Sequence, residues 1–218
     1  SRGDRVVDLV MYIIVGVLVG GRLGYMLFYD FHAFSRNPLI FFQVWTGGMA
    51  SHGGMIGVAV AVILYTWRQK KSLLLTGDLI ATAAAPGIFL GRVANFINGE
   101  LWGRPTDSPI GIIFPLADSV PRHPSQLYEA LGEGLLLFVY MQLRFWGKLG
   151  KAPPNGQLIG EFLVGYSVAR MVCEIFREPD ASLIIGLSRG QFYSIGTLLA
   201  GFGFILFARW NATRAAAK

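Results

Sequence analysis

The sequence predicts an all-α fold, a polytopic bundle of about six membrane-spanning helices with a small outward-facing head region. The composition is one reason, because 53% of the 218 residues are hydrophobic and only 15% are charged, which is too apolar for a soluble domain. A second reason is that six apolar segments approach the length of about 20 residues that the bilayer core requires. A third reason is that Lys and Arg are distributed unevenly between alternate loops.

The predicted spans belong to one integral membrane domain covering residues 1–218. Residues 98–123, between the third and fourth spans, are predicted to form the head region, and PPNG at 153–156 is predicted to form a loop. In the first span, Gly16, Gly20 and Gly24 recur at intervals of four, a pattern that lets helices approach closely in lipid. The six spans are 7–29, 51–67, 73–97, 124–146, 157–177 and 190–209.

The charge distribution predicts an orientation. Six spans place both chain ends on one side, where eleven Lys and Arg residues lie, whereas five lie on the other side. The positive-inside rule therefore predicts that both ends are cytoplasmic and that the head region faces outward. The three remaining cations, Arg22, Arg92 and Arg170, fall inside spans. The chain opens on the charged stretch SRGDRVVD, in which no signal peptide is predicted.

Composition also argues against several classes of partner and cofactor. The net charge is +6, but no basic block is interleaved with aromatic residues, so no nucleic-acid partner is predicted. The single cysteine and three widely separated histidines give no metal-ligand spacing. The sequence contains no P-loop or acidic metal cluster, so neither a metal nor a nucleotide cofactor is predicted.

The third span ends in polar residues. Arg92 and Asn95 lie near its outer end, and Asn98 and Glu100 follow. An arginine at the bilayer centre costs about 2.5–3.5 kcal/mol even on the lenient insertion scale. Residues 92 and 95 share a helix face, and so do 95 and 98. Arg92 either reaches the headgroups from a helix end or binds an anionic ligand.

The fifth span carries a similar polar face. Tyr166, Arg170 and Glu174 are spaced at intervals of four, Arg177 lies seven residues after Arg170, and all four are predicted to project from one helix face. One interpretation is an internal salt bridge between Arg170 and Glu174. The other is that Arg92 and Arg170, at similar depth on different helices, form a paired anion site for which a lipid phosphate is the most available ligand.

Other polar residues in or near the spans are open to two interpretations. His52 is either a helix cap or a general base with a pKa near the working pH. Glu129 is either a buried partner for an arginine or a ligand of a lipid headgroup. Arg22 is a further intramembrane arginine and a candidate for lipid binding. Asp78 is interpreted as a helix-start residue, and Cys173 as a packing residue.

Several motifs together resemble the prolipoprotein diacylglyceryl transferase family. They are GRVANFINGELWGRPT, preceded by HGGMIG and followed by RHPSQLYE and GYSVARMVCEIFREPD. GGRLGYMLFY and SRGQFYS are also similar to that family, so the resemblance spans almost the whole chain with the motifs in family order. The family usually has seven spans with its N-terminus outside. This chain begins at what resembles the second span, which agrees with six spans that start in the cytoplasm.

The resemblance implies transfer of the diacylglyceryl group of phosphatidylglycerol to the lipobox cysteine thiol of a bacterial prolipoprotein, at the inner membrane and without a cofactor. A thioether forms and glycerol phosphate leaves. The resemblance also implies that Arg92 and Arg170 hold the phosphatidylglycerol headgroup, and that His52 is the candidate base. Asn95, Asn98 and Glu100 are then expected to orient the Arg92 guanidinium and the glycerol head of the lipid. Further functionally sensitive positions that match the family are Asn95, Glu100, Gly103, Tyr166 and Glu174.

Two alternatives come from other functional classes. A transporter or flippase for an anionic lipid would also carry intramembrane arginines, but it predicts polar residues along whole spans and repeated halves. Here the polar residues cluster at the outer ends and no repeat is visible, so this alternative ranks below the transferase. The other alternative is a lipid-dependent structural subunit. It would give no role to His52 or to the polar helix face of Tyr166, Arg170 and Glu174.

Overall fold

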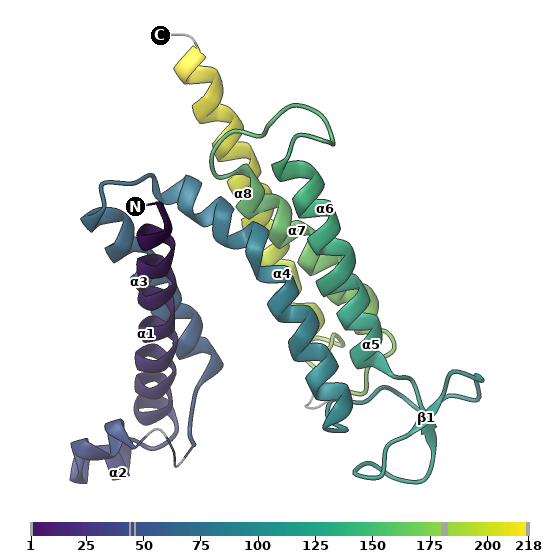
Figure 1. Cartoon of the computed structure of the whole chain (residues 1–218). Helices are drawn as coiled ribbons and strands as arrows, with labels where there is room; N and C mark the ends of the chain where they lie inside the picture. Colours follow the sequence, from purple (N-terminus) through teal and green to yellow (C-terminus); the bar gives the residue numbers. More distant parts are fainter. Residues whose placement is uncertain (1, 44, 46, 180–182, 217–218) are drawn as a thin grey trace. The chain divides into compact units, whose positions relative to one another are not determined.

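The computed structural model describes residues 2–43, 45, 47–179 and 183–216. All six predicted spans are helical in it, which confirms the all-α prediction (Figure 1). By length and composition, α1 from Arg5, α4 and α8 could each cross a membrane. The helices are α1 (Arg2–Phe28), α3 (Ser51–Arg68), α4 (Leu73–Ile97), α5 (Ser125–Glu129), the π-helical η3 (Ala130–Leu136), α6 (Leu137–Phe145), α7 (Gln157–Cys173) and α8 (Arg189–Ala216).

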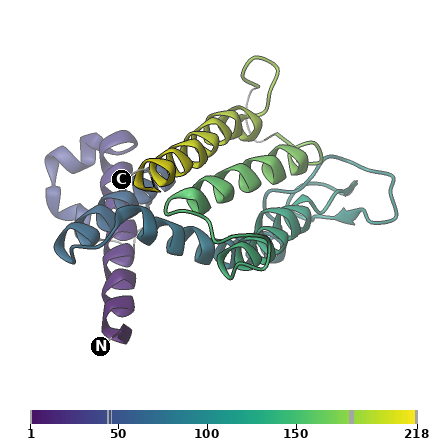
Figure 2. The same cartoon turned by 90° about the horizontal axis from the view of Figure 1, so that it is seen from above.

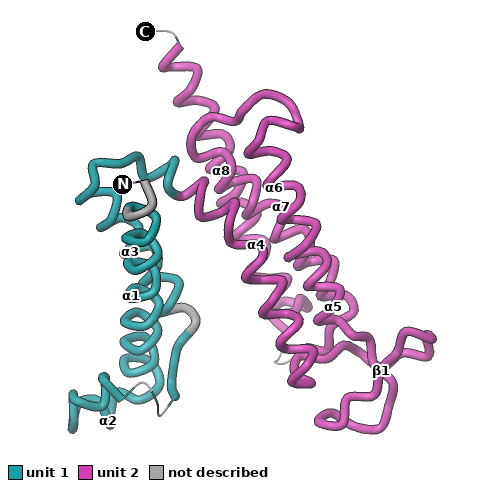
Figure 3. The backbone as a smooth tube through the Cα atoms, in the orientation of Figure 1, with its two compact units in different colours: residues 1–76 teal, residues 77–218 magenta. Residues whose placement is uncertain are grey.

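The chain forms two compact units, residues 1–76 and 77–218 (Figure 3). In the first unit, α1 packs along α3, and the short helices α2 (Phe31–Arg36) and η1 (Pro38–Phe42) follow α1. Glycines line this helix contact, as the small-xxx-small pattern predicted. A Cβ added at Gly24 would lie 2.9 Å from the Cα of Gly53, and one added at Gly57 would collide with the carbonyl oxygen of Gly16.

Replacing Gly57 with alanine is expected to lower the stability of the first unit. The added methyl group must push α1 away from α3, and overpacking of this kind typically costs about 1–3 kcal/mol. The measurement is the thermal unfolding midpoint in detergent micelles. Gly54→Ala is the matched control on the same helix, because its Cβ would lie an ordinary 3.8 Å from the Val17 carbonyl oxygen. Equal midpoints for the two variants would contradict the close-packing argument.

In the second unit, α7 lies between α8 and the continuous α5–η3–α6 stretch (Figures 1 and 2). The α4 helix joins this layer through an apolar core. The core contains two alanines that let the helices approach and larger side chains that fill the space between them: Ala81, Ala85, Leu137, Met141 and Leu158. This core holds α4, α6 and α7 together near the N-terminal ends of α4 and α7.

Some span boundaries differ from the prediction. The α7 helix ends at Cys173 rather than at 177, so the prediction that Arg177 shares the helix face of Arg170 is wrong. The chain leaves the helix because residues 176–178 bond to the head region: Arg104 N–H donates to the Phe176 carbonyl at 2.9 Å, and Arg177 forms a β-bridge with Gly103. The last helix continues to Ala216, beyond the predicted end at 209, in a segment rich in helix-favouring Ala and Arg.

The head region contains more than a loop. A short antiparallel hairpin pairs β1 (Ile112–Ile113) with β2 (Pro121–Arg122). Arg122 also binds Asp118 at 2.7 Å, and this hydrogen-bonded guanidinium holds the pKa of the Asp118 carboxyl below its usual value. Gly103 lies where the head meets the end of α7, and a Cβ there would lie 2.6 Å from the Phe176 carbonyl oxygen. A side chain at residue 103 would therefore separate the two segments.

Candidate functional site

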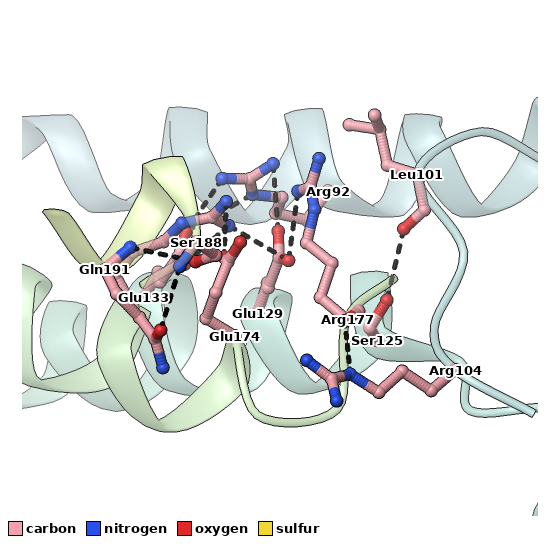
Figure 4. Close-up of polar contacts among 11 residues, drawn as sticks. Arg92, Leu101, Arg104, Ser125, Glu129, Glu133, Glu174, Arg177, Ser188 and Gln191 are labelled. Atoms are coloured by element: carbon pink, nitrogen blue, oxygen red, sulfur yellow. Dashed lines mark hydrogen bonds and ion pairs between the residues drawn. The ribbon is translucent and has the colours of Figure 1, made fainter. Parts of the chain in front are cut away.

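Six ionisable side chains converge within the second unit (Figure 4). Arg92 comes from α4, and Glu129 and Glu133 come from the α5–η3 stretch. The third contribution is α7 and the turn that follows it, which bring Arg170, Glu174 and Arg177. We call these six residues the arginine–glutamate cluster.

Arg92 bridges the two carboxylates of the α5–η3 stretch. Its Nη1 lies 2.9 Å from Glu129 Oε2, and its Nη2 lies 3.0 Å from Glu133 Oε2. Its Nε also donates to the same Glu133 oxygen at 3.2 Å. The guanidinium of Arg92 is therefore oriented by two charges rather than free to rotate.

Arg170 binds the same two carboxylates from the α7 side. Its Nη1 lies 3.0 Å from Glu129 Oε1 and 3.4 Å from Glu133 Oε1, while its Nη2 lies 2.8 Å from Glu174 Oε2. Arg177 Nη1 approaches Glu129 Oε1 at 3.2 Å. The predicted Arg170–Glu174 salt bridge is thus present, and Glu129 is a buried arginine partner. The pair Arg92 and Arg170 is brought together as predicted.

Burial differs within the cluster, because its carboxylates and Arg177 are buried whereas Arg92 and Arg170 are partly exposed. The Glu129 and Glu133 side chains are 1% and 0% exposed, whereas those of Arg92 and Arg170 are 18% and 12% exposed. Ionised groups at such depth persist only when they are paired, and here three arginines face three glutamates. Because the open side of the cluster is formed by guanidinium groups, an incoming anion would meet arginine before carboxylate.

Sequence reasoning missed Glu133. A signal was available, because Glu133 lies four residues after Glu129 in an apolar span, and carboxylates at that spacing share a helix face. Intramembrane carboxylates usually have a partner or a function, and two on one face indicate a facing pair of cations. Arg177 was noted on the sequence, but its place in the cluster depends on the turn after α7.

The polar residues that follow Arg92 in the sequence, Asn95, Asn98 and Glu100, are not members of the arginine–glutamate cluster. Among the described residues, Arg92 is held by Glu129 and Glu133 rather than by Asn95, Asn98 or Glu100. Asn98 and Glu100 are exposed, and the Asn95 carbonyl accepts the Glu100 N–H at 2.9 Å. Their contact with a lipid headgroup stays a prediction.

Tyr166 lies one helical turn before Arg170, and its ring stacks on Phe162 with centroids 6.3 Å apart. The tyrosine is therefore part of the same stretch of α7 as the cluster. Cys173 at the end of α7 is buried, in agreement with its predicted packing role.

Arg22 and His52 belong to the first unit. Arg22 is 2% exposed and donates to the carbonyl oxygens of Ile40 at 2.7 Å and Gln43 at 2.9 Å, among others in the following segment. It thereby anchors the segment after α1 to the helix, and its predicted lipid contact stays a prediction. His52 lies in the first turn of α3, and its side chain lies outside the described residues.

The interpretation of Asp78 as a helix-start residue is wrong. The α4 helix begins five residues earlier, at Leu73, and the Asp78 carboxylate instead accepts backbone N–H groups at the start of α7.

Within the residues that the structure describes, no group of three His, Cys, Asp or Glu side chains is placed to hold a metal ion.

Comparison with known sequences decides the family. Residues 1–207 match the family described as prolipoprotein diacylglyceryl transferase. The chain belongs to this family. Three similar relatives are each named phosphatidylglycerol–prolipoprotein diacylglyceryl transferase. They are from Pseudoalteromonas translucida (45% identical; 97% of this chain and 79% of the relative), Rhodospirillum centenum (46%; 97% and 78%) and Zymomonas mobilis (48%; 95% and 73%).

Membership in the prolipoprotein diacylglyceryl transferase family agrees with the apolar helices and makes the chain a multi-pass membrane protein. Five residues of the arginine–glutamate cluster come from three of the segments that carry the resemblance, 91–106, 122–129 and 165–180. The sixth, Glu133, lies four residues after the second of these segments. Three of the motifs that carry the resemblance therefore contribute side chains to the cluster.

Proposed function

We propose that this chain transfers the diacylglyceryl group of phosphatidylglycerol to the lipobox cysteine thiol of a prolipoprotein, and that Arg92 and Arg170 bind the lipid phosphate. The observation that carries the proposal is the convergence of these two arginines, from separate helices, on one pair of buried carboxylates. The names of the relatives supply the substrates. Family membership gives no support to the transporter alternative.

The reaction exchanges one bond for another. The thiol loses its proton to a base, because the thiolate is the nucleophile. Its sulfur then forms a thioether with the carbon of the diacylglyceryl group that carries the phosphate oxygen. The carbon–oxygen bond to the phosphate breaks, and glycerol phosphate leaves with the bonding electron pair. Negative charge grows on the phosphate as it leaves, and guanidinium groups fixed in advance stabilise that charge without reorganising.

The carboxylates prepare the arginines for this task. A side chain as long as arginine has many rotamers, and Glu129 and Glu133 select those in which both guanidinium groups point to one place. On binding, phosphate oxygens take over guanidinium N–H groups on the more open face of the cluster. Paired, bidentate N–H donors suit phosphate well.

The base is proposed to be His52. Replacing it with asparagine is expected to lower the transfer rate by about 10²–10⁴-fold, the typical contribution of a general base. The pH profile of the residual rate should also lose the rise near neutral pH that a histidine base produces. His123→Asn is the control, because His123 lies in the head and its Nδ1 contacts the Tyr128 hydroxyl at 3.1 Å. An unchanged pH profile in His52→Asn would assign the base elsewhere.

The chain is proposed to lie in the bacterial inner membrane with both ends in the cytoplasm and the cluster near the periplasmic surface. The excess of Lys and Arg in the loops on the side of the chain ends supports this orientation. A cysteine introduced for the exposed Leu116 of the head should react with a membrane-impermeant maleimide in intact spheroplasts. Reaction only after lysis would reverse the orientation.

The function itself is tested with a lipobox peptide and vesicles that contain phosphatidylglycerol. Addition of one diacylglyceryl mass to the peptide, seen by mass spectrometry, is the expected result. The same peptide with serine in place of its cysteine should stay unmodified, as should the original peptide in vesicles of a zwitterionic lipid alone. A folded chain that modifies no peptide under these conditions would overturn the proposal.

A further inference from the structure

The Asp78 side chain joins the N-terminal ends of two helices that carry the proposed phosphate ligands. It lies in the second turn of α4 and is only 4% exposed. Its Oδ2 accepts the Gly156 N–H at 2.6 Å, and its Oδ1 accepts the Ile159 N–H at 2.9 Å. Both oxygens of one carboxylate therefore bond to the start of α7.

The start of α7 needs such a partner. The first N–H groups of a helix have no acceptor within the helix, and here the capping position is Gly156, which has no side chain to supply one. A carboxylate at a helix N-terminus is also favoured by the helix dipole. Asp78 meets both needs from a neighbouring helix rather than from its own chain segment.

The spacing along the two helices gives this bond a second consequence. Arg92 lies fourteen residues after Asp78 on α4, and Arg170 lies fourteen residues after Gly156, the residue that precedes α7. With a rise of about 1.5 Å per residue, Arg92 lies about 21 Å along α4 from Asp78, and Arg170 lies about 17–21 Å along α7 from the Ile159 and Gly156 N–H groups. Because both helices run the same way from that bond, their arginines arrive at a similar level and meet the same two carboxylates.

Apolar contacts between α4 and α7 also lie near this bond. A Cβ at Gly77 would lie 2.6 Å from Ile159 Cδ1, and Leu158 packs in the core with Ala81 and Ala85. The hydrophobic effect is non-directional, so apolar contact selects one axial position less strictly than hydrogen bonds do. Hydrogen bonds have strict distance and angle requirements, and Asp78 supplies two of them.

We propose that Asp78 is a positioning residue for the transferase: it sets the axial register of α4 against α7, and so brings Arg92 and Arg170 to one level for the lipid phosphate. This inference rests on the proposed function. It assigns to a residue about four helical turns from the phosphate site a part in assembling that site.

The first test is kinetic. Asp78→Ala removes both bonds, whereas Asp78→Asn keeps one acceptor oxygen and guards against loss of folding. Misplacement of a binding group by about 1 Å can cost 10²-fold, so we expect kcat/KM for phosphatidylglycerol to fall by roughly 10–100-fold in Asp78→Ala and by less in Asp78→Asn. The matched control is Gln142→Ala, which removes a 3.3 Å bond from α6 to the Thr82 carbonyl of α4 but leaves the α4–α7 bond intact. The control should stay within about threefold of the parent, since a neutral hydrogen bond contributes about 1 kcal/mol.

The second test measures the register directly and does not depend on activity. Spin labels at the exposed positions Leu90 of α4 and Val168 of α7, in a Cys173→Ser background, report the distance between the helices. In Asp78→Ala we expect this distance to shift or broaden by ångströms, up to about 5.4 Å for a slip of one turn. In Gln142→Ala it should stay unchanged.

The two measurements separate the possible failures. An unchanged label distance in the folded Asp78 variants would overturn the positioning role, whatever their activity. A shifted distance with unchanged kcat/KM would also overturn it, because the register would then not matter to the site. If the distance shifts in the Asp78 variant but the unchanged chain itself modifies no lipobox peptide, the proposed function is overturned. The register would then be a structural property of α4 and α7 only.

Discussion

Replacing Arg170 with alanine is expected to lower the rate of diacylglyceryl transfer by about 10²–10³-fold, the effect of removing one fixed donor to a developing negative charge. Arg170 is held by three carboxylates and its side chain is 12% exposed, so its guanidinium group is fixed in place before the lipid binds. The measurement is the initial rate of peptide modification over a range of phosphatidylglycerol mole fractions. The loss should appear in kcat as well as in KM, because the charge that Arg170 stabilises grows in the transition state.

Two companion variants make this result specific. Arg170→Lys keeps the charge but loses the planar fork of donors, so its rate should lie between those of the parent and the alanine variant. Arg144→Ala breaks a half-buried pair of the same unit, with Glu161 at 2.7 Å, which is not part of the cluster. It should lower stability without a matching loss of rate per folded molecule. Near-parental activity of folded Arg170→Ala would refute the phosphate clamp.

Replacing Glu129 with alanine is expected to destabilise the second unit by about 3–5 kcal/mol, the usual result of removing one partner from a buried ion pair. Its two oxygens approach Arg92 at 2.9 Å, Arg170 at 3.0 Å and Arg177 at 3.2 Å. Without it, three guanidinium groups share the two carboxylates of Glu133 and Glu174. The measurement is the unfolding midpoint in detergent micelles, followed by tryptophan fluorescence.

The control for Glu129 is an ion pair outside the cluster. Glu178 contacts Arg122 at 3.2 Å with its side chain 44% exposed, and exposed pairs typically contribute only about 0–1 kcal/mol. Glu178→Ala should therefore unfold close to the parent. If Glu129→Ala and Glu178→Ala unfold at the same temperature, the cluster does not stabilise the unit as its geometry indicates.

Much of the fold follows from the sequence because bilayer length and hydropathy are properties of single segments. Counting along the chain predicts the six helical stretches and a close, glycine-lined helix contact of the first span. It also predicts the meeting of Arg92 with Arg170, whereas the partner of the first span, α3, comes from the structure. The end of α7 does not, because residues 176–178 leave the helix to bond with Gly103 and Arg104, about seventy residues away. Helix propensity contains no information about that partner.

Partners of individual polar residues were harder to predict than their depth. Asp is a residue type typical of helix starts, yet the Asp78 carboxylate caps the start of another helix by accepting the N–H groups of Gly156 and Ile159. Arg22 lies in an apolar sequence segment, as Arg92 and Arg170 do, but its described contacts are backbone carbonyls of the segment after α1. A burial cost indicates that a partner exists, whereas tertiary packing decides which partner it is.

The number of residues in the π-helical turn at Ala130–Leu136 matters to the site as much as which residues they are, because this number sets the direction of the side chains on either side of the turn. Before and within the turn lie Glu129 and Glu133, which face the arginines, and after it lie Leu137 and Met141, which enter the core with α4. Deleting one residue from the turn would rotate one side against the other by about 100°, the angle per residue of an α-helix. Carboxylates and core residues could then not both face α4. Related chains that keep this cluster should therefore tolerate exchange of side chains in the turn far better than a change in its length.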